Sequence, residues 1–372
     1  MKLNKGEWGE PYVALRLLGE GKLQMADENG EAKPDEWMDV VELIRHETAD
    51  RIVAYDRNAE TTMIEVEING DPVVSLPAKD FLEAANNLSR DIKAGKGASF
   101  EVSNEVNDFF LVAEMLTLKA KSVDKSDIFL TTLDPRSSVT RKRIGFSIKS
   151  KFGQNPTLFN TAPASGVRYL LEGCTQSDME DINGIVDDKG HVAVSSRCSA
   201  IIERGIKPLY VGYALARRAN CEAFKDNLDI IDPRLPSVIE QMLRNHFFAG
   251  DTSINIPEVV SRIIDENPCA VSRPEVKYPY MIKSFLYAAY CGMTASTLWD
   301  GNGQVNGGFI TVDENGKVLA HYALESEEFK SYLYNNCYLE FPATSKGHGD
   351  YAKVYKENGK YYFNLNFQIR YR

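Results

Sequence analysis

The stretch Lys125-Ser126-Asp127-Ile128-Phe129-Leu130 is followed, after a polar segment, by Ile144-Gly145-Phe146-Ser147-Ile148-Lys149-Ser150-Lys151. Both runs are rich in β-branched and aromatic residues and alternate in part between apolar and polar positions, which predicts two short strands. Residues 131–143 between them contain Pro135 and several Ser and Thr residues, as is typical of a hairpin connection. Asp127 and Lys149 are therefore expected to lie near each other on adjacent antiparallel strands.

A carboxylate beside a lysine on neighbouring strands suits metal-assisted cleavage of a phosphodiester bond. The carboxylate would hold a divalent cation, and the ammonium would position the attacking water and offset charge on the phosphate. The alternative is an ordinary hairpin in which Asp127 and Lys149 are solvated.

The pair resembles the core of the PD-(D/E)xK nucleases. In that motif a second carboxylate stands two residues before the lysine, and here this position is Ser147. Asp127, Ser147 and Lys149 are thus the predicted catalytic set, and a further acid must come from elsewhere. In such folds a glutamate on the first core helix often approaches the metal, which favours Glu10, then Glu7, as metal ligands beside Asp127. The alternative is that both glutamates only serve the helix dipole.

A strongly basic window surrounds the second strand. Residues 135–171 contain no Asp or Glu and seven Lys or Arg, in a chain of net charge −10. Such a local excess of positive charge in an acidic chain suits binding of a phosphate backbone. It equally fits a solvated face whose basic groups pair with acids of other segments. The residues assigned to phosphate binding are Arg141, Lys142, Arg143 and Lys151.

Other candidate DNA contacts lie later in the chain. Arg217 and Arg218 fall on a predicted helix and could read guanine edges, or could instead pair with acids such as Glu222. Asn302 opens a glycine-rich loop that offers further donors for guanine. Asn160, after the lysine strand, is a candidate neutral metal ligand or phosphate contact.

The chain as a whole resembles the HpaII-type restriction endonucleases. The resemblance is carried by residues 4–13, by the two strands quoted above, by 156–160, by Trp299-Asp300-Gly301 with Asn306-Gly307-Gly308, and by 364–371. It implies a bacterial, Mg²⁺-dependent enzyme that cuts double-stranded DNA at CCGG and leaves a 5′-phosphate. It also implies a DNA methyltransferase that protects the host. Cutting both strands of a palindrome favours a homodimer on DNA or sequential nicking. The alternatives are a DNA-binding protein with a decayed nuclease site and an acidic globular protein without a nucleic-acid partner.

The expected fold class is α/β, in the mixed α+β sense. It comprises a PD-(D/E)xK restriction-endonuclease-like core at 1–174, a largely helical region at 175–298 and a β-rich region at 299–372 that packs on the core and contacts DNA. The predicted helices cover 5–23, 78–93, 104–120, 211–224, 236–248, 257–266 and 279–291. The predicted strands cover 38–47, 51–55, 62–68 and 168–172, with hairpins over 309–321 and 351–366.

Composition excludes several classes of protein. No run of 18 apolar residues is present, so no membrane span is expected, and the first residues lack the apolar stretch of a secretory signal. The six cysteines are spread singly and the five histidines are far apart, which argues against a zinc site and for reduced thiols in a cytoplasm.

Overall fold

The computed structural model describes residues 2–118, 126–213, 222–302, 307–323, 326–341 and 350–372. The chain forms two compact units. The first comprises Met1–Pro156 and Val305–Tyr332, and the second comprises Thr157–Gln304 and Leu333–Arg372. Strands from residues 308–322 belong to the first unit because they pair within its sheet.

In the described part of the first unit, nine strands form one sheet in the order β1-β12-β11-β7-β6-β2-β3-β4-β5. The predicted hairpin is confirmed, since β6 and β7 pair antiparallel with Ile128 opposite Phe146. On its other side β7 pairs in parallel with β11, which comes more than 150 residues later. The strands are β1 (Lys22–Ala26), β2 (Ala32–Thr48), β3 (Arg51–Arg57), β4 (Met63–Ile68), β5 (Asp71–Pro77), β6 (Ile128–Leu133), β7 (Thr140–Ser150), β11 (Gly308–Val312) and β12 (Val318–Tyr322).

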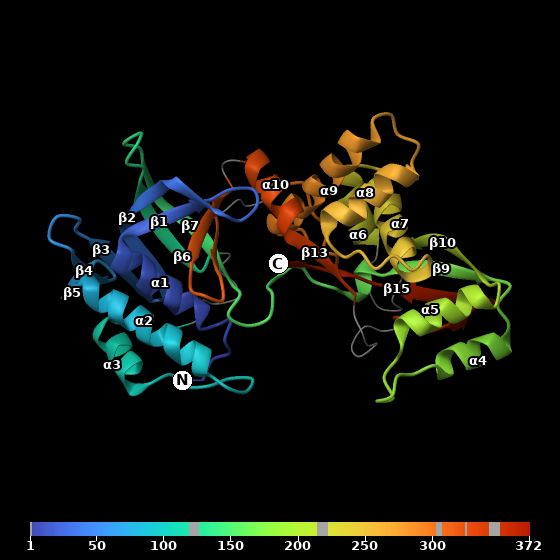
Figure 1. Cartoon of the computed structure of the whole chain (residues 1–372), viewed down its shortest axis with the longest axis horizontal. Helices are drawn as coiled ribbons and strands as arrows, with labels where there is room; N and C mark the ends of the chain where they lie inside the picture. Colours follow the sequence, from blue (N-terminus) through green and yellow to red (C-terminus); the bar gives the residue numbers. More distant parts are fainter. Residues whose placement is uncertain (1, 119–125, 214–221, 303–306, 324–325, 342–349) are drawn as a thin grey trace. The chain divides into compact units, whose positions relative to one another are not determined.

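Helices α1 (Gly9–Glu20) and α2 (Ala78–Ala94) pack against each other in this unit, with α3 (Asn104–Val112) beside α2 (Figure 1). Their apolar sides share one core with Phe146 and Ile148 of β7. The helix predicted over 5–23 is too long. It ends at Gly21, whose φ of 68° is left-handed and whose N–H bonds to the carbonyl of Leu17. A glycine adopts that conformation without steric cost, so the chain can turn directly into β1.

The second unit holds six helices among its described residues, followed by part of a seventh. They are α4 (Gln176–Gly184), α5 (Val194–Glu203), α6 (Glu222–Ile231), α7 (Leu235–Phe248), α8 (Ile256–Glu266), α9 (Pro274–Tyr290) and α10 (Ser326–Asn336), which begins in the first unit. Two small sheets, ordered β10-β9-β15-β14 and β13-β16-β8, accompany them. Their strands are β8 (Thr157–Phe159), β9 (Val167–Glu172), β10 (Lys207–Tyr213), β13 (Cys337–Glu340), β14 (Tyr355–Glu357), β15 (Lys360–Leu365) and β16 (Gln368–Tyr371).

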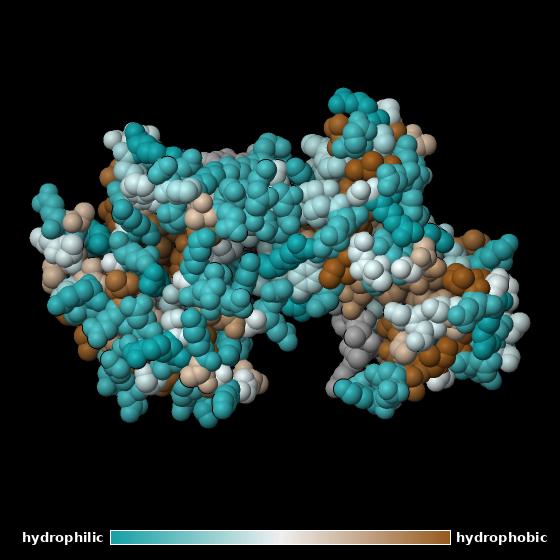
Figure 2. Space-filling model, viewed as in Figure 1, coloured by the Kyte–Doolittle hydropathy of each residue, from teal (hydrophilic) through white to brown (hydrophobic). Residues whose placement is uncertain are grey.

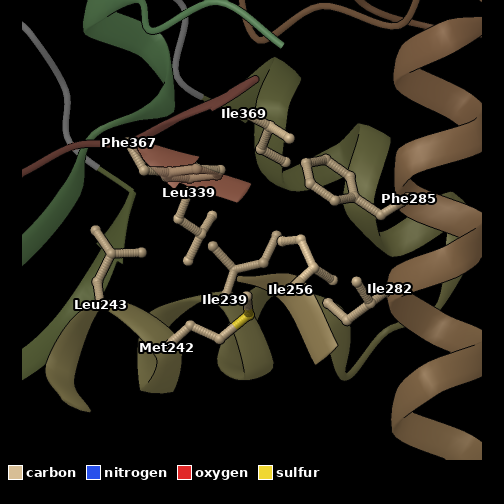
Figure 3. Close-up of a pocket in the computed structure, with 9 residues that line it drawn as sticks. All are labelled: Ile239, Met242, Leu243, Ile256, Ile282, Phe285, Leu339, Phe367 and Ile369. Carbon is tan, nitrogen blue, oxygen red and sulfur yellow. The ribbon is translucent and has the colours of Figure 1, made fainter. Parts of the chain in front are cut away.

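Helices α7, α8 and α9 close on β13 and β16 through apolar side chains. Figure 3 shows these side chains pointing toward one another, among them Met242, Phe285 and Leu339. The void left between them is only about 10 Å³, which is room for roughly one water molecule. This is the packed core of the second unit, and its lining has no polar surface with which to orient a ligand.

Three further sequence predictions of elements are wrong in part. The helix predicted over 211–224 begins instead as strand, because residues 211–213 belong to β10, which pairs with β9. Residues 214–221 lie outside the described residues, and α6 starts at Glu222. The helix predicted over 104–120 stops at Val112, just before Glu114 with its φ of 58°. Helix α9 begins five residues before Pro279, which lies inside it.

None of the helices in the described ranges has the length and apolar character needed to cross a membrane. The face seen in Figure 2 is mainly hydrophilic, with smaller hydrophobic areas between the polar ones.

Candidate active site

Asp127 is fixed to the strand that carries Lys149. Its backbone N–H donates to the carbonyl of Phe146 at 2.8 Å, and its Oδ2 accepts the backbone N–H of Ile148 at 2.5 Å. Because Lys149 follows Ile148 directly, the carboxylate lies beside the lysine, as the sequence predicted. Both side chains are half-buried.

Burial removes both charged groups of the pair from water, and this shifts their pKa values. Burial raises the pKa of the Asp127 carboxyl, while the Ile148 hydrogen bond and the Lys149 ammonium act against that rise. Burial lowers the pKa of Lys149, and the carboxylates of Asp127 and Glu10 oppose the change. Asp127 and Glu10 therefore both act electrostatically on Lys149 in the folded chain.

Glu7 is engaged differently, in the turn of residues 5–8 that leads into α1. The backbone N–H of Asn4 donates to its Oε2 at 3.0 Å, and its own N–H donates to Oδ1 of Asn4 at 2.9 Å. This reciprocal pattern is that of a capping box, which satisfies N–H groups at the beginning of a helix. The geometry thus separates the two glutamates, with Glu10 interacting with Lys149 and Glu7 bonded to Asn4.

Two glycines let α1 approach β7, and their importance is not evident from sequence patterns. A Cβ added to Gly9 would lie 2.4 Å from both Cβ and Oγ of Ser150, and one added to Gly153 would lie 3.2 Å from the amide nitrogen of Gly6. Such contacts exclude a side chain at Gly9 without movement of the backbone. The close approach sets the first turn of α1, with Glu10, against the end of β7.

Ser147 stands two residues before Lys149 on β7, opposite Phe309 of β11. Alternation along a strand places Ser147 and Lys149 on the same face of the sheet. Across the part of the chain that the structure describes, no three Asp, Glu, His or Cys side chains cluster closely enough to hold a metal ion together. A metal here would have at most two carboxylate ligands from those residues.

Three of the seven basic residues of the window pair with acids, as the alternative interpretation of the window expected. Arg143 contacts Glu42 at 3.0 Å, Arg136 contacts Glu36 at 3.3 Å, and Arg168 pairs with Glu357. Each of these acids lies outside the window, so local charge counting could not find them.

The four residues assigned to phosphate binding differ in their surroundings. Lys142 is exposed, whereas the Arg141 guanidinium lies 5.3 Å from the ring centroid of Tyr322. Burial lowers the pKa of Lys151, with Asp313, Glu31 and Glu314 opposing. Arg143 precedes Lys149 by six residues of strand, which corresponds to roughly 20 Å of extended chain. Arg141, Lys142 and Arg143 therefore lie at the opposite end of the hairpin from the Asp127–Lys149 pair.

The remaining candidates belong to the second unit or lie outside the described residues. Asn160 is exposed directly after β8, and Asn302 is exposed in a turn after α9. Arg217 and Arg218 lie outside the described residues.

Comparison with known proteins gives the class of this protein. A family model described as HpaII restriction endonuclease matches residues 4–371. Type II restriction enzyme HpaII from Haemophilus parainfluenzae is 28% identical over 371 residues, which cover 99% of this chain and 98% of that protein. The protein is thus a type II site-specific deoxyribonuclease, an enzyme that acts on DNA. Within that class, the chain belongs to the HpaII restriction endonuclease family, which confirms the resemblance seen in the sequence. No solved structure matches the chain significantly.

Proposed function

We propose that this enzyme hydrolyses DNA phosphodiester bonds at a Mg²⁺ site built on Asp127 and Glu10, with Lys149 beside the scissile phosphate, in a PD-(D/E)xK-like core. The observation that carries the proposal is the hydrogen bond from Ile148 to Asp127, because it holds a carboxylate next to a lysine on adjacent strands. Membership of a restriction endonuclease family supplies the substrate, DNA.

The donor set fits a magnesium ion. Mg²⁺ prefers oxygen ligands, keeps several waters and is commonly held by one or two carboxylates together with substrate phosphate. Asp127 and Glu10 supply two such carboxylates, and Ser147 could add a neutral oxygen. When bound, the ion would polarise the phosphate and acidify a coordinated water.

Lys149 supplies the positive charge. Its burial weakens solvent screening, so its ammonium acts more strongly on a nearby phosphate than an exposed lysine would. Asp127 and Glu10 favour the charged form against the effect of burial. We assign to Lys149 the orientation of the attacking water and the stabilisation of charge that develops on the phosphate.

For the recognition site we propose CCGG, with a 5′-phosphate at the cut and a methyltransferase that protects host DNA. The support is similarity to an enzyme named HpaII over nearly the whole of both chains. A palindromic site read by one active site per chain favours a homodimer on DNA or sequential nicking.

The test is digestion of plasmid DNA with Mg²⁺, followed by sequencing of the cleaved ends. We expect discrete fragments with ends at CCGG and no cleavage in EDTA. Discrete ends at another sequence would reject CCGG and keep the nuclease site. Undiminished cleavage in EDTA would reject the metal site. Binding without any cleavage would favour the alternative of a decayed site.

A further inference from the structure

Asn227 on α6 is fully buried, and both polar atoms of its side chain bond to one loop after α9. Its Nδ2 donates to the carbonyls of Thr294 at 2.9 Å and Thr297 at 2.8 Å. Its Oδ1 accepts the backbone N–H of Trp299 at 2.8 Å. A buried amide is tolerated only when it is hydrogen-bonded, and these three bonds go to a single backbone segment. Asn227 thereby fixes the path of residues 294–299.

The anchored segment leads into a tight turn. The indole N–H of Trp299 donates to the carbonyl of Asn302 at 3.0 Å, and the backbone N–H of Asn302 donates to Oδ1 of Asp300 at 2.9 Å. The side-chain nitrogen of Asn302 faces Oδ2 of Asp300 at 3.4 Å. Both carboxylate oxygens of Asp300 therefore accept from Asn302, which fixes the orientation of the carboxylate within the turn.

The turn is exposed although its anchor is buried. Asp300, Gly301 and Asn302 are exposed, and Leu298 beside them is 69% exposed. The backbone N–H of Asn302 lowers the pKa of the Asp300 carboxyl, which keeps it ionised and able only to accept hydrogen bonds. An exposed carboxylate in such a turn repels phosphate and matches a hydrogen-bond donor.

Base edges in the major groove differ in the donors they offer. Guanine presents two acceptors, whereas cytosine presents its N4 amino group and adenine its N6 amino group. An exposed carboxylate, which can only accept, therefore fits an amino-bearing base. In the proposed CCGG site the amino-bearing base is cytosine.

We infer that Asn227 is a positioning residue that holds the Trp299–Asn302 turn so that the Asp300 carboxylate accepts from the amino group of a cytosine in the recognition site. This inference rests on the proposed function. It assigns part of base recognition to a short turn and to the buried amide that anchors it.

The first test measures the ratio of two cleavage rates, that on the preferred duplex and that on a duplex with one base pair changed. Asn227→Ala should lower that ratio about tenfold or more, the equivalent of losing one good base contact. Binding to a random duplex should stay within about twofold. The matched control is Asn245→Ala, since Asn245 is a buried asparagine of the same unit that bonds to Glu266 and Gln241 instead of this loop. Asn227→Asp, which keeps the acceptor for Trp299, serves if the alanine variant does not fold.

The second test measures binding to duplexes with N4-methylcytosine at each site cytosine in turn. The wild-type enzyme should lose about tenfold in affinity at the contacted cytosine, and Asp300→Ala should be insensitive there. Equal sensitivity of the two proteins at every cytosine would overturn the inference, as would an unchanged cleavage ratio in Asn227→Ala. A wild-type enzyme without any site preference would instead overturn the proposed function as well.

Discussion

Asp127 and Ile148 are joined by a 2.5 Å hydrogen bond in which a backbone N–H of β7 donates to the carboxylate. This contact fixes the acid to the strand of Lys149, although the two residues of the pair are far apart in sequence. It also opposes the effect of burial on the carboxyl, whose pKa nevertheless stays raised. Burial therefore makes ionisation of Asp127 less favourable, at the position where the proposed chemistry needs a charged carboxylate.

Asp127→Asn should abolish cleavage without lowering thermal stability. A raised folded-state pKa means that ionisation of Asp127 destabilises the fold at neutral pH, and the neutral amide removes that cost while its oxygen still accepts from Ile148. We expect an unchanged Tm or a rise of about 1–3 °C in a melting experiment. Mg²⁺ should raise the Tm of the wild-type enzyme and not that of the variant, because ligand binding stabilises only the competent site. An equal Mg²⁺ effect on both proteins would remove Asp127 from the metal site.

As the pH is lowered, the cleavage activity should fall at a higher pH than the usual pKa of an aspartate would predict. Asp127 must lose its proton to bind a cation, and its raised pKa moves that loss to higher pH. The metal competes with the proton, so a higher Mg²⁺ concentration should shift the acid limb to lower pH. The measurement is single-turnover cleavage against pH at two Mg²⁺ concentrations. An acid limb that does not move with Mg²⁺ would argue against this coupling.

Glu10→Ala and Glu7→Ala should separate chemistry from helix capping. Loss of the Glu7 cap should cost about 1 kcal/mol of stability, with a moderate effect on cleavage. Glu10→Ala should lower the cleavage rate by roughly 10² or more with little change in stability, by analogy with removal of one electrostatic stabiliser. Urea unfolding and single-turnover rates measure the two effects. The reverse pattern would exchange the roles that we give the two glutamates.

Gly9→Ala should slow cleavage although alanine favours helices by about 1 kcal/mol. The new methyl would collide with Ser150, which must displace the first turn of α1 and with it Glu10. Ser150→Gly in the same chain should restore much of the rate, since it removes the atoms in conflict. The double-mutant cycle of rates tests this coupling. Additive effects of the two changes would contradict it.

The Glu42–Arg143 ion pair predicts that substitutions of its two members have opposite effects on DNA binding. Arg143 is mostly exposed and Glu42 mostly buried, so the arginine can exchange its partner for a phosphate. Arg143→Ala should weaken binding evenly across sequences and reduce the slope of log affinity against log salt by about 1. Glu42→Gln should strengthen binding at low salt. Titrations of random and preferred duplexes check both, and a changed site preference in Arg143→Ala would assign it to base reading.

Local sequence patterns predicted the central hairpin, the neighbouring strands β2, β3 and β4, and several helices of the second unit. The pairing of β7 with β11 was not predictable, because no local pattern encodes contact between segments so distant in sequence. The same limit applies to Glu42 and Glu357, which neutralise arginines of the basic window from distant strands. Residues 211–213 were assigned to a helix because a short apolar run does not distinguish strand from helix without its neighbours.

At the candidate site, residue chemistry pointed to Asp127 and Lys149, and resemblance to PD-(D/E)xK folds pointed to Glu10; in the fold, both carboxylates act electrostatically on Lys149. The sequence ranked Glu10 ahead of Glu7 but did not show the hydrogen bonds between Asn4 and Glu7, since these depend on backbone geometry. It also missed Asn227, because a buried asparagine has no sequence signature until the loop that it anchors is known.

The most direct measurement is the single-turnover cleavage rate of Lys149→Ala on a preferred duplex, with enzyme in excess and Mg²⁺ present. The account predicts a rate lower by roughly 10² or more, while the affinity for the same duplex stays within a few-fold of wild type. Cleavage by Lys149→Ala at the wild-type rate would contradict the assignment of the active site to the β6–β7 hairpin.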